Sequence, residues 1–124
     1  MLLHVQQDGN NAFKRGDYHE AIQLYTQCLD LDSSVLAAHA NRAMAYLKAG
    51  QSNEALADCE AVLRQDTQNV KCWLRKGQAC WDLQRPSEAV AAWRRCLELQ
   101  PGNAQAKELL AKAYSAGTGE DSAE

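Results

Sequence analysis

Two cations in the stretch VKCWLRKGQ, residues 70–78, have the spacing of an anion-binding pair. Lys71 and Arg75 lie four residues apart, which places them on one face of an α-helix about one turn apart. Like charges at that spacing repel and weaken an isolated helix. Arginine can bind a carboxylate through two hydrogen bonds, and lysine adds a compact charge. Taken alone, such a pair is more often a solvated helix face, so its interpretation depends on the residues around it.

The composition confines any positive site to a local patch. The 124 residues carry a formal net charge of −3, which argues against general affinity for nucleic acid or an anionic membrane. No apolar run approaches the length of a membrane-spanning helix. The first residues, MLLHVQQD, lack the basic flank and the apolar length of a signal peptide. We therefore expect a monomeric, cytoplasmic domain of a larger protein, with no nucleic-acid or membrane partner.

Motifs for catalysis, cofactors or metals are missing from the sequence. The five cysteines are an odd number without a CxxC pair, so full disulfide pairing is impossible and zinc-ligand spacing is absent. We interpret them as small buried apolar residues in a reducing compartment. The histidines have no Cys, Asp or Glu partner at metal spacing, and there is no nucleophile elbow or phosphate-binding glycine loop. We expect a binding module that uses no cofactor, not an enzyme.

The chain repeats itself every 34 residues, and this repeat supplies the elements that position the cations. Each repeat has two amphipathic helices joined by a short turn. The predicted repeats span about 2–35, 36–69 and 70–103. Their first helices cover about 3–15, 36–49 and 70–83, and their second helices end near residues 31, 65 and 99. The interval links four sets of residues: Gly9, Ala43 and Gly77; Ala21, Ala55 and Ala89; Tyr25, Cys59 and Trp93; and Leu29, Leu63 and Leu97.

A seventh helix, about residues 104–115, is predicted to cap the stack. Leu109, Leu110 and Ala113 would cover its open end while Lys107 and Lys112 face water, because a solenoid buries its apolar face only against neighbouring repeats. Residues 116–124 are rich in glycine and acidic side chains, so we expect a disordered tail.

Small residues are predicted where the two helices of a repeat approach closely. Gly9, Ala43 and Gly77 would lie on the first helices, facing the alanines of the second helices at positions 21, 55 and 89. Larger side chains would push each pair apart.

Small, aromatic and leucine residues recur at fixed positions of each repeat: Gly9, Ala12, Gly16, Asp17, Tyr18, Ala21, Tyr25 and Leu29; then Ala43, Tyr46, Gly50, Ala55 and Leu63; then Trp73, Gly77, Ala89, Trp93, Leu97 and Pro101. This pattern and its period resemble the tetratricopeptide repeat (TPR) family over residues 2–115. The resemblance implies an all-α, right-handed superhelical solenoid with Trp73 and Trp93 in the core. The first helix of each repeat would line a concave groove. Ser33 and Thr67 replace the family's usual proline, so those turns are expected to be less rigid.

Four residues of the groove resemble the carboxylate clamp of co-chaperone TPR domains: Asn10, Asn41, Lys71 and Arg75. Such domains bind the C-terminal EEVD peptide of the seventy- and ninety-kilodalton heat-shock chaperones. Gln6 stands where the clamp has its first lysine. The resemblance implies a chaperone-recruiting adaptor, and the missing cation would weaken binding or shift the preferred acidic terminus.

Helical phase adds Phe13, Met44, Lys48, Gln78 and Trp81 to the groove. Phe13 and Met44 are candidates for apolar ligand pockets, and Lys48 for partial compensation of the lost cation. Trp81 has two open interpretations, packing on a ligand side chain or packing on the capping helix.

Two other functions remain open on the sequence. A scaffold TPR would hold an internal segment of a non-chaperone partner, and the absent lysine favours it. Self-association through the convex face or the capping helix is the third possibility.

Overall fold

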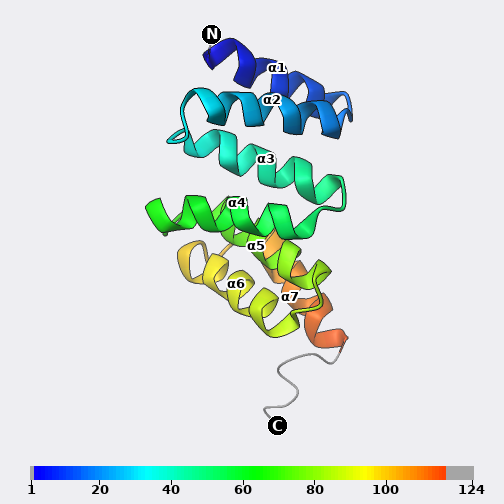
Figure 1. The fold of residues 1–124 in the computed structure, drawn as a ribbon. Helices are drawn as coiled ribbons and strands as arrows, with labels where there is room; N and C mark the ends of the chain where they lie inside the picture. Colours follow the sequence, from blue (N-terminus) through cyan, green and yellow to red (C-terminus); the bar gives the residue numbers. More distant parts are fainter. Residues whose placement is uncertain (1, 117–124) are drawn as a thin grey trace.

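A computed structural model describes residues 2–116, and this range contains seven α-helices and no strand (Figure 1). The six helix ends predicted for the three repeats lie within one residue of the observed ends. No helix in the described range is long and apolar enough to cross a membrane. The predicted acidic tail lies, except for Ala116, outside the described residues. The helices are α1 (Leu2–Lys14), α2 (Tyr18–Leu31), α3 (Leu36–Lys48), α4 (Ser52–Gln65), α5 (Val70–Asp82), α6 (Pro86–Leu99) and α7 (Ala104–Ser115).

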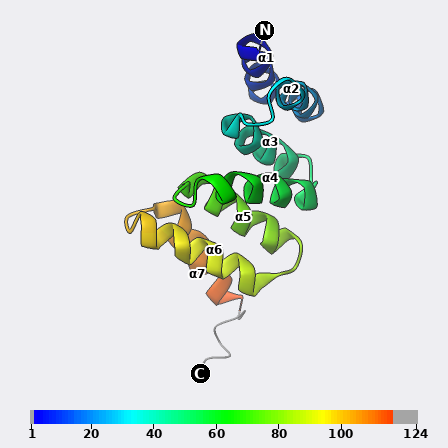
Figure 2. The ribbon, with the colours of Figure 1, turned by 60° about the vertical axis from the view of Figure 1, so that its left-hand side comes forward.

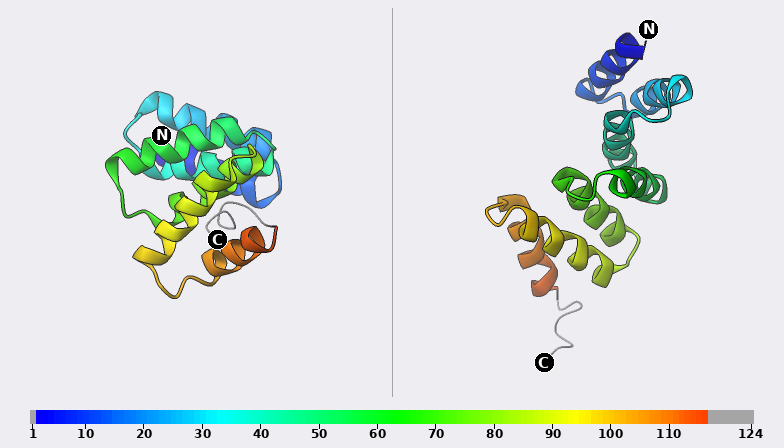
Figure 3. Two further views of the ribbon diagram at one scale, coloured as in Figure 1. Left: turned by 90° about the horizontal axis from the view of Figure 1, so that it is seen from below. Right: turned by 90° about the vertical axis from the view of Figure 1, so that its left-hand side faces the viewer.

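The helices follow one another in chain order along a curved stack (Figures 2 and 3). Each helix packs on the next, and the first helices of successive repeats also contact each other, α1 with α3 and α3 with α5. This second set of contacts brings one face of α1, α3 and α5 onto the same side of the molecule. The all-α repeat architecture predicted from the sequence is therefore confirmed.

Glycines allow an aromatic ring of the second helix to approach the first helix in two repeats. A Cβ atom added to Gly9 would lie 2.7 Å from Cε1 of Tyr25, and one added to Gly77 would overlap Nε1 of Trp93. Both rings are 2% exposed. The nearest atoms to both glycines therefore belong to these rings, which the sequence prediction of facing alanines did not include, because an aromatic ring fills the space that a missing side chain leaves.

Replacing Gly77 with alanine is expected to lower the free energy of unfolding by about 1–3 kcal/mol, since the new methyl group overpacks a filled core. The Trp93 ring has little room to move, because its Nε1 donates a hydrogen bond to the Leu74 carbonyl oxygen at 3.2 Å. Urea denaturation followed by circular dichroism measures the change. Gly102→Ala is the matched control, because a Cβ at Gly102 meets nothing within 4 Å. Equal stability of the two variants would contradict this packing.

The C-terminal helix α7 closes the end of the stack. Leu110 and Ala113 are buried in the cluster that surrounds Trp93, with Leu109 packed beside it, whereas Lys107 and Lys112 are exposed. This agrees with the predicted cap.

Trp73 packs against the core, as the sequence predicts, but it is only partly buried. It lies half-buried beside the cluster of Val62, Leu63 and Cys72, and Nζ of Lys76 lies 5.3 Å from its ring centroid. Its indole Nε1 donates to the Thr67 carbonyl oxygen at 2.9 Å. The ring therefore covers the turn between the second and third repeats, which supplies the acceptor that the indole N–H needs.

All five cysteines are free and buried, as small apolar residues would be. Burial raises the pKa of the Cys28 and Cys80 thiols, and it raises the pKa of Cys96 to about 11. These three thiols therefore remain protonated at neutral pH, and they pack as apolar groups.

Candidate functional site

A cavity of about 370 Å³ lies on the side of the stack that α1, α3 and α5 share. It brings together three of the four predicted clamp residues, Asn10 of α1, Asn41 of α3 and Arg75 of α5. These residues are far apart in the chain and come from three successive repeats. The other lining residues are Gln7, Phe13, Lys14, Tyr25, Met44 and Lys48.

The orientation of the Asn10 amide is fixed by two donors. The Tyr25 hydroxyl donates to its Oδ1 at 2.6 Å, and Nδ2 of Asn41 donates to the same oxygen at 3.3 Å. Burial raises the pKa of Tyr25, and the nearby charge of Arg75 opposes this shift only in part, so the phenol keeps its proton. Asn10 lines the cavity and its oxygen is engaged, so the part of its amide left to contact an anion is the N–H donors.

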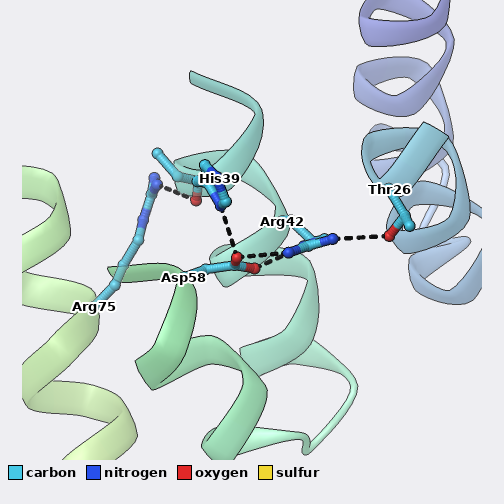
Figure 4. A network of polar contacts seen from close by, with 6 residues as sticks. Thr26, His39, Arg42, Asp58 and Arg75 are labelled. Atoms are coloured by element: carbon cyan, nitrogen blue, oxygen red, sulfur yellow. Dashed lines mark hydrogen bonds and ion pairs between the residues drawn. The ribbon is translucent and has the colours of Figure 1, made fainter. Parts of the chain in front are cut away.

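The guanidinium of Arg75 is held beside Asn41 by the main chain of α3. Its Nη1 donates to the Ala40 carbonyl oxygen at 2.8 Å (Figure 4). A guanidinium carries five N–H donors in a rigid fork, so one bond to the protein leaves the others for a ligand. The arrangement places a positive charge next to two carboxamides, which suits one carboxylate group.

A second cavity of about 410 Å³ continues the groove toward the C-terminal helix. It shares Met44, Lys48 and Arg75 with the first cavity. Lys71, the fourth predicted clamp residue, is exposed and lines this second cavity but not the first. The remaining lining residues are Leu47, Leu74, Gln78, Asp82, Gln105 and Leu109.

Two residues predicted for the groove line neither cavity. Gln6 is half-buried one turn before Asn10, and its neighbour Gln7 lines the first cavity instead. Trp81 is half-buried in the core, with its ring centroid 5.9 Å from that of Trp93. The other predicted groove residues, Phe13, Met44, Lys48 and Gln78, all line one or both cavities.

The sequence prediction missed the contribution of Tyr25 to the site. Its place in the aromatic set of the repeat indicated only a core position. The detectable signal is the difference between the repeats, because Tyr25 alone in this set carries a hydroxyl group, and a buried hydroxyl needs a partner.

Behind the groove, a buried carboxylate ties α3 to its neighbours (Figure 4). Asp58 of α4 accepts two hydrogen bonds from Arg42, from Nε and from Nη2, each at 2.8 Å. Arg42 also donates to Oγ1 of Thr26 on α2 at 3.0 Å. His39 Nδ1 lies 3.0 Å from Asp58 Oδ1, and since a carboxylate only accepts, this nitrogen carries the hydrogen. The network fixes the helix that carries Asn41.

Stacked helical hairpins with a groove along their first helices define a helical-repeat protein of the interaction class. Two family models described as tetratricopeptide repeat match the chain, one over residues 8–70 and one over residues 47–113. The chain belongs to the tetratricopeptide repeat family, whose repeats are protein-interaction modules.

Similar proteins include domains solved with bound peptides. The first TPR of Spaghetti (RPAP3) bound to the HSP90 peptide SRMEEVD is 34% identical with a TM-score of 0.90, over 95% of this chain and 94% of that one. The second TPR domain of human RPAP3 in complex with the HSP70 peptide SGPTIEEVD is 37% identical with a TM-score of 0.84, over 89% of this chain and 92% of that one. Sperm-associated antigen 1 of Rattus norvegicus is 36% identical over 86% of this chain, which spans only 12% of that protein's length.

Proposed function

We propose that this chain is a non-catalytic adaptor whose groove binds the acidic C-terminal peptide of a heat-shock chaperone in the cytoplasm. The observation that carries the proposal is the convergence of Asn10, Asn41 and Arg75 on one cavity. Arg75 and Lys71 would bind the terminal carboxylate and the aspartate side chain. The two asparagines would donate to the same groups and to the peptide backbone.

The similarity to domains solved with EEVD peptides supports the choice of ligand. Both peptides, SRMEEVD and SGPTIEEVD, end in the same four residues. A cavity lined by basic and amide side chains suits a free carboxyl terminus, which concentrates negative charge in a small volume.

Calorimetric titration with SRMEEVD, once with a free and once with an amidated C-terminus, tests the proposal. We expect binding of the free peptide and a large loss of affinity on amidation, because amidation removes the charge that the clamp recognises. Equal affinity for the two peptides would contradict a clamp. It would favour the alternative, a scaffold that binds an internal segment of a non-chaperone partner.

The alternative is favoured by the presence of Gln6 where the clamp has a lysine. This position leads to a separate prediction. Gln6→Lys is expected to tighten binding of SRMEEVD about tenfold, because hydrogen bonds to charged groups contribute about 1–1.5 kcal/mol more than neutral ones. The position lies one helical turn before Asn10, so a lysine side chain can extend toward the same ligand. Calorimetry gives the affinity of both forms.

His4→Lys is the matched control for this substitution. It adds a lysine to the same helix at an exposed position that lines neither cavity, so it separates a local contact from the general effect of charge. Unchanged affinity in Gln6→Lys would show that residue 6 does not take part in the clamp.

A further inference from the structure

The two cavities form one groove that is lined mainly by basic side chains and carries one acidic side chain in its second part. They share Met44, Lys48 and Arg75, so a single extended chain can occupy both. The lining residues include four basic side chains, Lys14, Lys48, Lys71 and Arg75, and one acidic side chain, Asp82. The acidic residue lies at the last position of α5 and lines the second cavity, which does not include Asn10 and Asn41.

Asp82 is positioned by the protein, and within the described range it pairs with no cation. Oγ of Ser52, at the start of α4, donates to its Oδ2 at 3.3 Å, and Ser52 is 9% exposed. No ion pair within residues 2–116 involves Asp82. The side chain is exposed and borders the second cavity. A carboxylate held in this way at the rim of a groove attracts a ligand cation.

The distance along the groove indicates which ligand residue reaches Asp82. Seven residues separate Arg75 from Asp82, which is about 10 Å along the helix axis. The step from α5 across to the neighbouring helix is about 8–10 Å and runs roughly at right angles to this axis, so the direct separation is about 13–14 Å. An extended peptide advances about 3.3 Å per residue. A peptide whose terminal carboxylate lies among Asn10, Asn41 and Arg75 therefore reaches Asp82 with a residue about four or five positions upstream.

We infer that Asp82 is a specificity-determining residue that selects acidic C-terminal peptides with a basic side chain at this upstream position. The inference rests on the proposed function and adds the chemistry of the upstream part of the ligand. SRMEEVD has an arginine five residues before its terminal aspartate, whereas SGPTIEEVD has no basic residue. The groove is therefore matched to a terminus of the first kind.

Calorimetry with two peptides that differ in one residue, SRMEEVD and SQMEEVD, tests this inference. The wild-type protein is expected to bind the arginine peptide about threefold more tightly, which is the strength of a solvent-exposed ion pair. In Asp82→Asn this preference is expected to disappear. The asparagine oxygen can still accept from Ser52, so the variant keeps the local structure. Glu108→Gln is the control, because Glu108 is exposed on α7 and lines neither cavity; it should keep the preference.

Equal affinity of the wild-type protein for the two peptides would overturn the inference, as would a preference that persists in Asp82→Asn. If both peptides bind equally and still require a free carboxylate, the proposed function stands and the role of Asp82 falls. If neither peptide binds to the folded protein, both proposals fall. High salt should reduce the preference, because an exposed pair is screened by ions.

Discussion

Replacing Asp58 with alanine is expected to lower the free energy of unfolding by about 3 kcal/mol or more, because it leaves a nearly buried guanidinium without its carboxylate. The Asp58 side chain is only 4% exposed and that of Arg42 is 18% exposed. Asp58 is the first cause of the raised pKa of Arg42, through its hydrogen bonds. Removing it deprives both Arg42 and His39 of an acceptor, and Arg42 keeps only its bond to Thr26 and its contact with the Tyr46 ring.

Urea denaturation of three variants measures this effect. Asp58→Asn keeps the shape and part of the hydrogen bonding, so it should lose less stability than Asp58→Ala. Asp8→Ala removes an exposed carboxylate from α1 and should change stability by less than about 0.5 kcal/mol. A double variant of Asp58 and Arg42 to alanine should cost less than the sum of the two single changes. If Asp58→Ala is as stable as Asp8→Ala, the network does not stabilise the fold.

The repeat interval made the architecture predictable from the sequence. Three aligned copies of one pattern give the helix ends and the capping helix, because each apolar stripe has only a neighbouring repeat to pack against. The same alignment also shows that the first and third repeats combine a glycine on the first helix with a large aromatic residue on the second: Gly9 with Tyr25, and Gly77 with Trp93. In the second repeat these positions hold Ala43 and Cys59, both buried. A larger residue on one helix thus accompanies a smaller one on the other, a regularity that the sequence contains and that our prediction of facing alanines overlooked.

The buried network could not be read from charge alone. Asp58 and Arg42 look like solvated helix residues in the sequence, and their pairing depends on how α3 packs on α4. One signal was present, however. Asp58 lies three residues after Ala55 and four before Val62, both of which are buried, so it shares the apolar face of its helix. A carboxylate on such a face needs a partner, so a basic partner on a neighbouring helix could be expected, although its identity depends on the packing.

The arrangement of the candidate clamp residues was predictable only in part, because helical phase gives the face of a helix but not the reach of its side chains. It placed Asn10, Asn41 and Arg75 on one side, where the structure brings them to one cavity. It gave Trp81 the same phase, yet that ring turns toward Trp93, since a large aromatic side chain gains more from burial than from exposure at a rim.

Replacing Arg75 with alanine is expected to lower the affinity for SRMEEVD by at least about a hundredfold. A guanidinium that binds a carboxylate through two charge-assisted hydrogen bonds loses about 1.5–3 kcal/mol for each. Loss of the bond to the Ala40 carbonyl oxygen should cost about 1 kcal/mol of stability, so the variant remains folded. Calorimetry measures the affinity, and circular dichroism checks the fold.

Lys76→Ala is the matched control, because Lys76 follows Arg75 on the same helix but contacts Glu60 and the Trp73 ring. It removes the same charge and should leave peptide affinity nearly unchanged. Arg75→Lys keeps the charge without the fork, so an intermediate affinity is expected. If Arg75→Ala binds the peptide as tightly as Lys76→Ala does, the carboxylate is not recognised at this cavity. Retention of affinity only in Arg75→Lys would instead show that charge, and not bidentate geometry, determines binding.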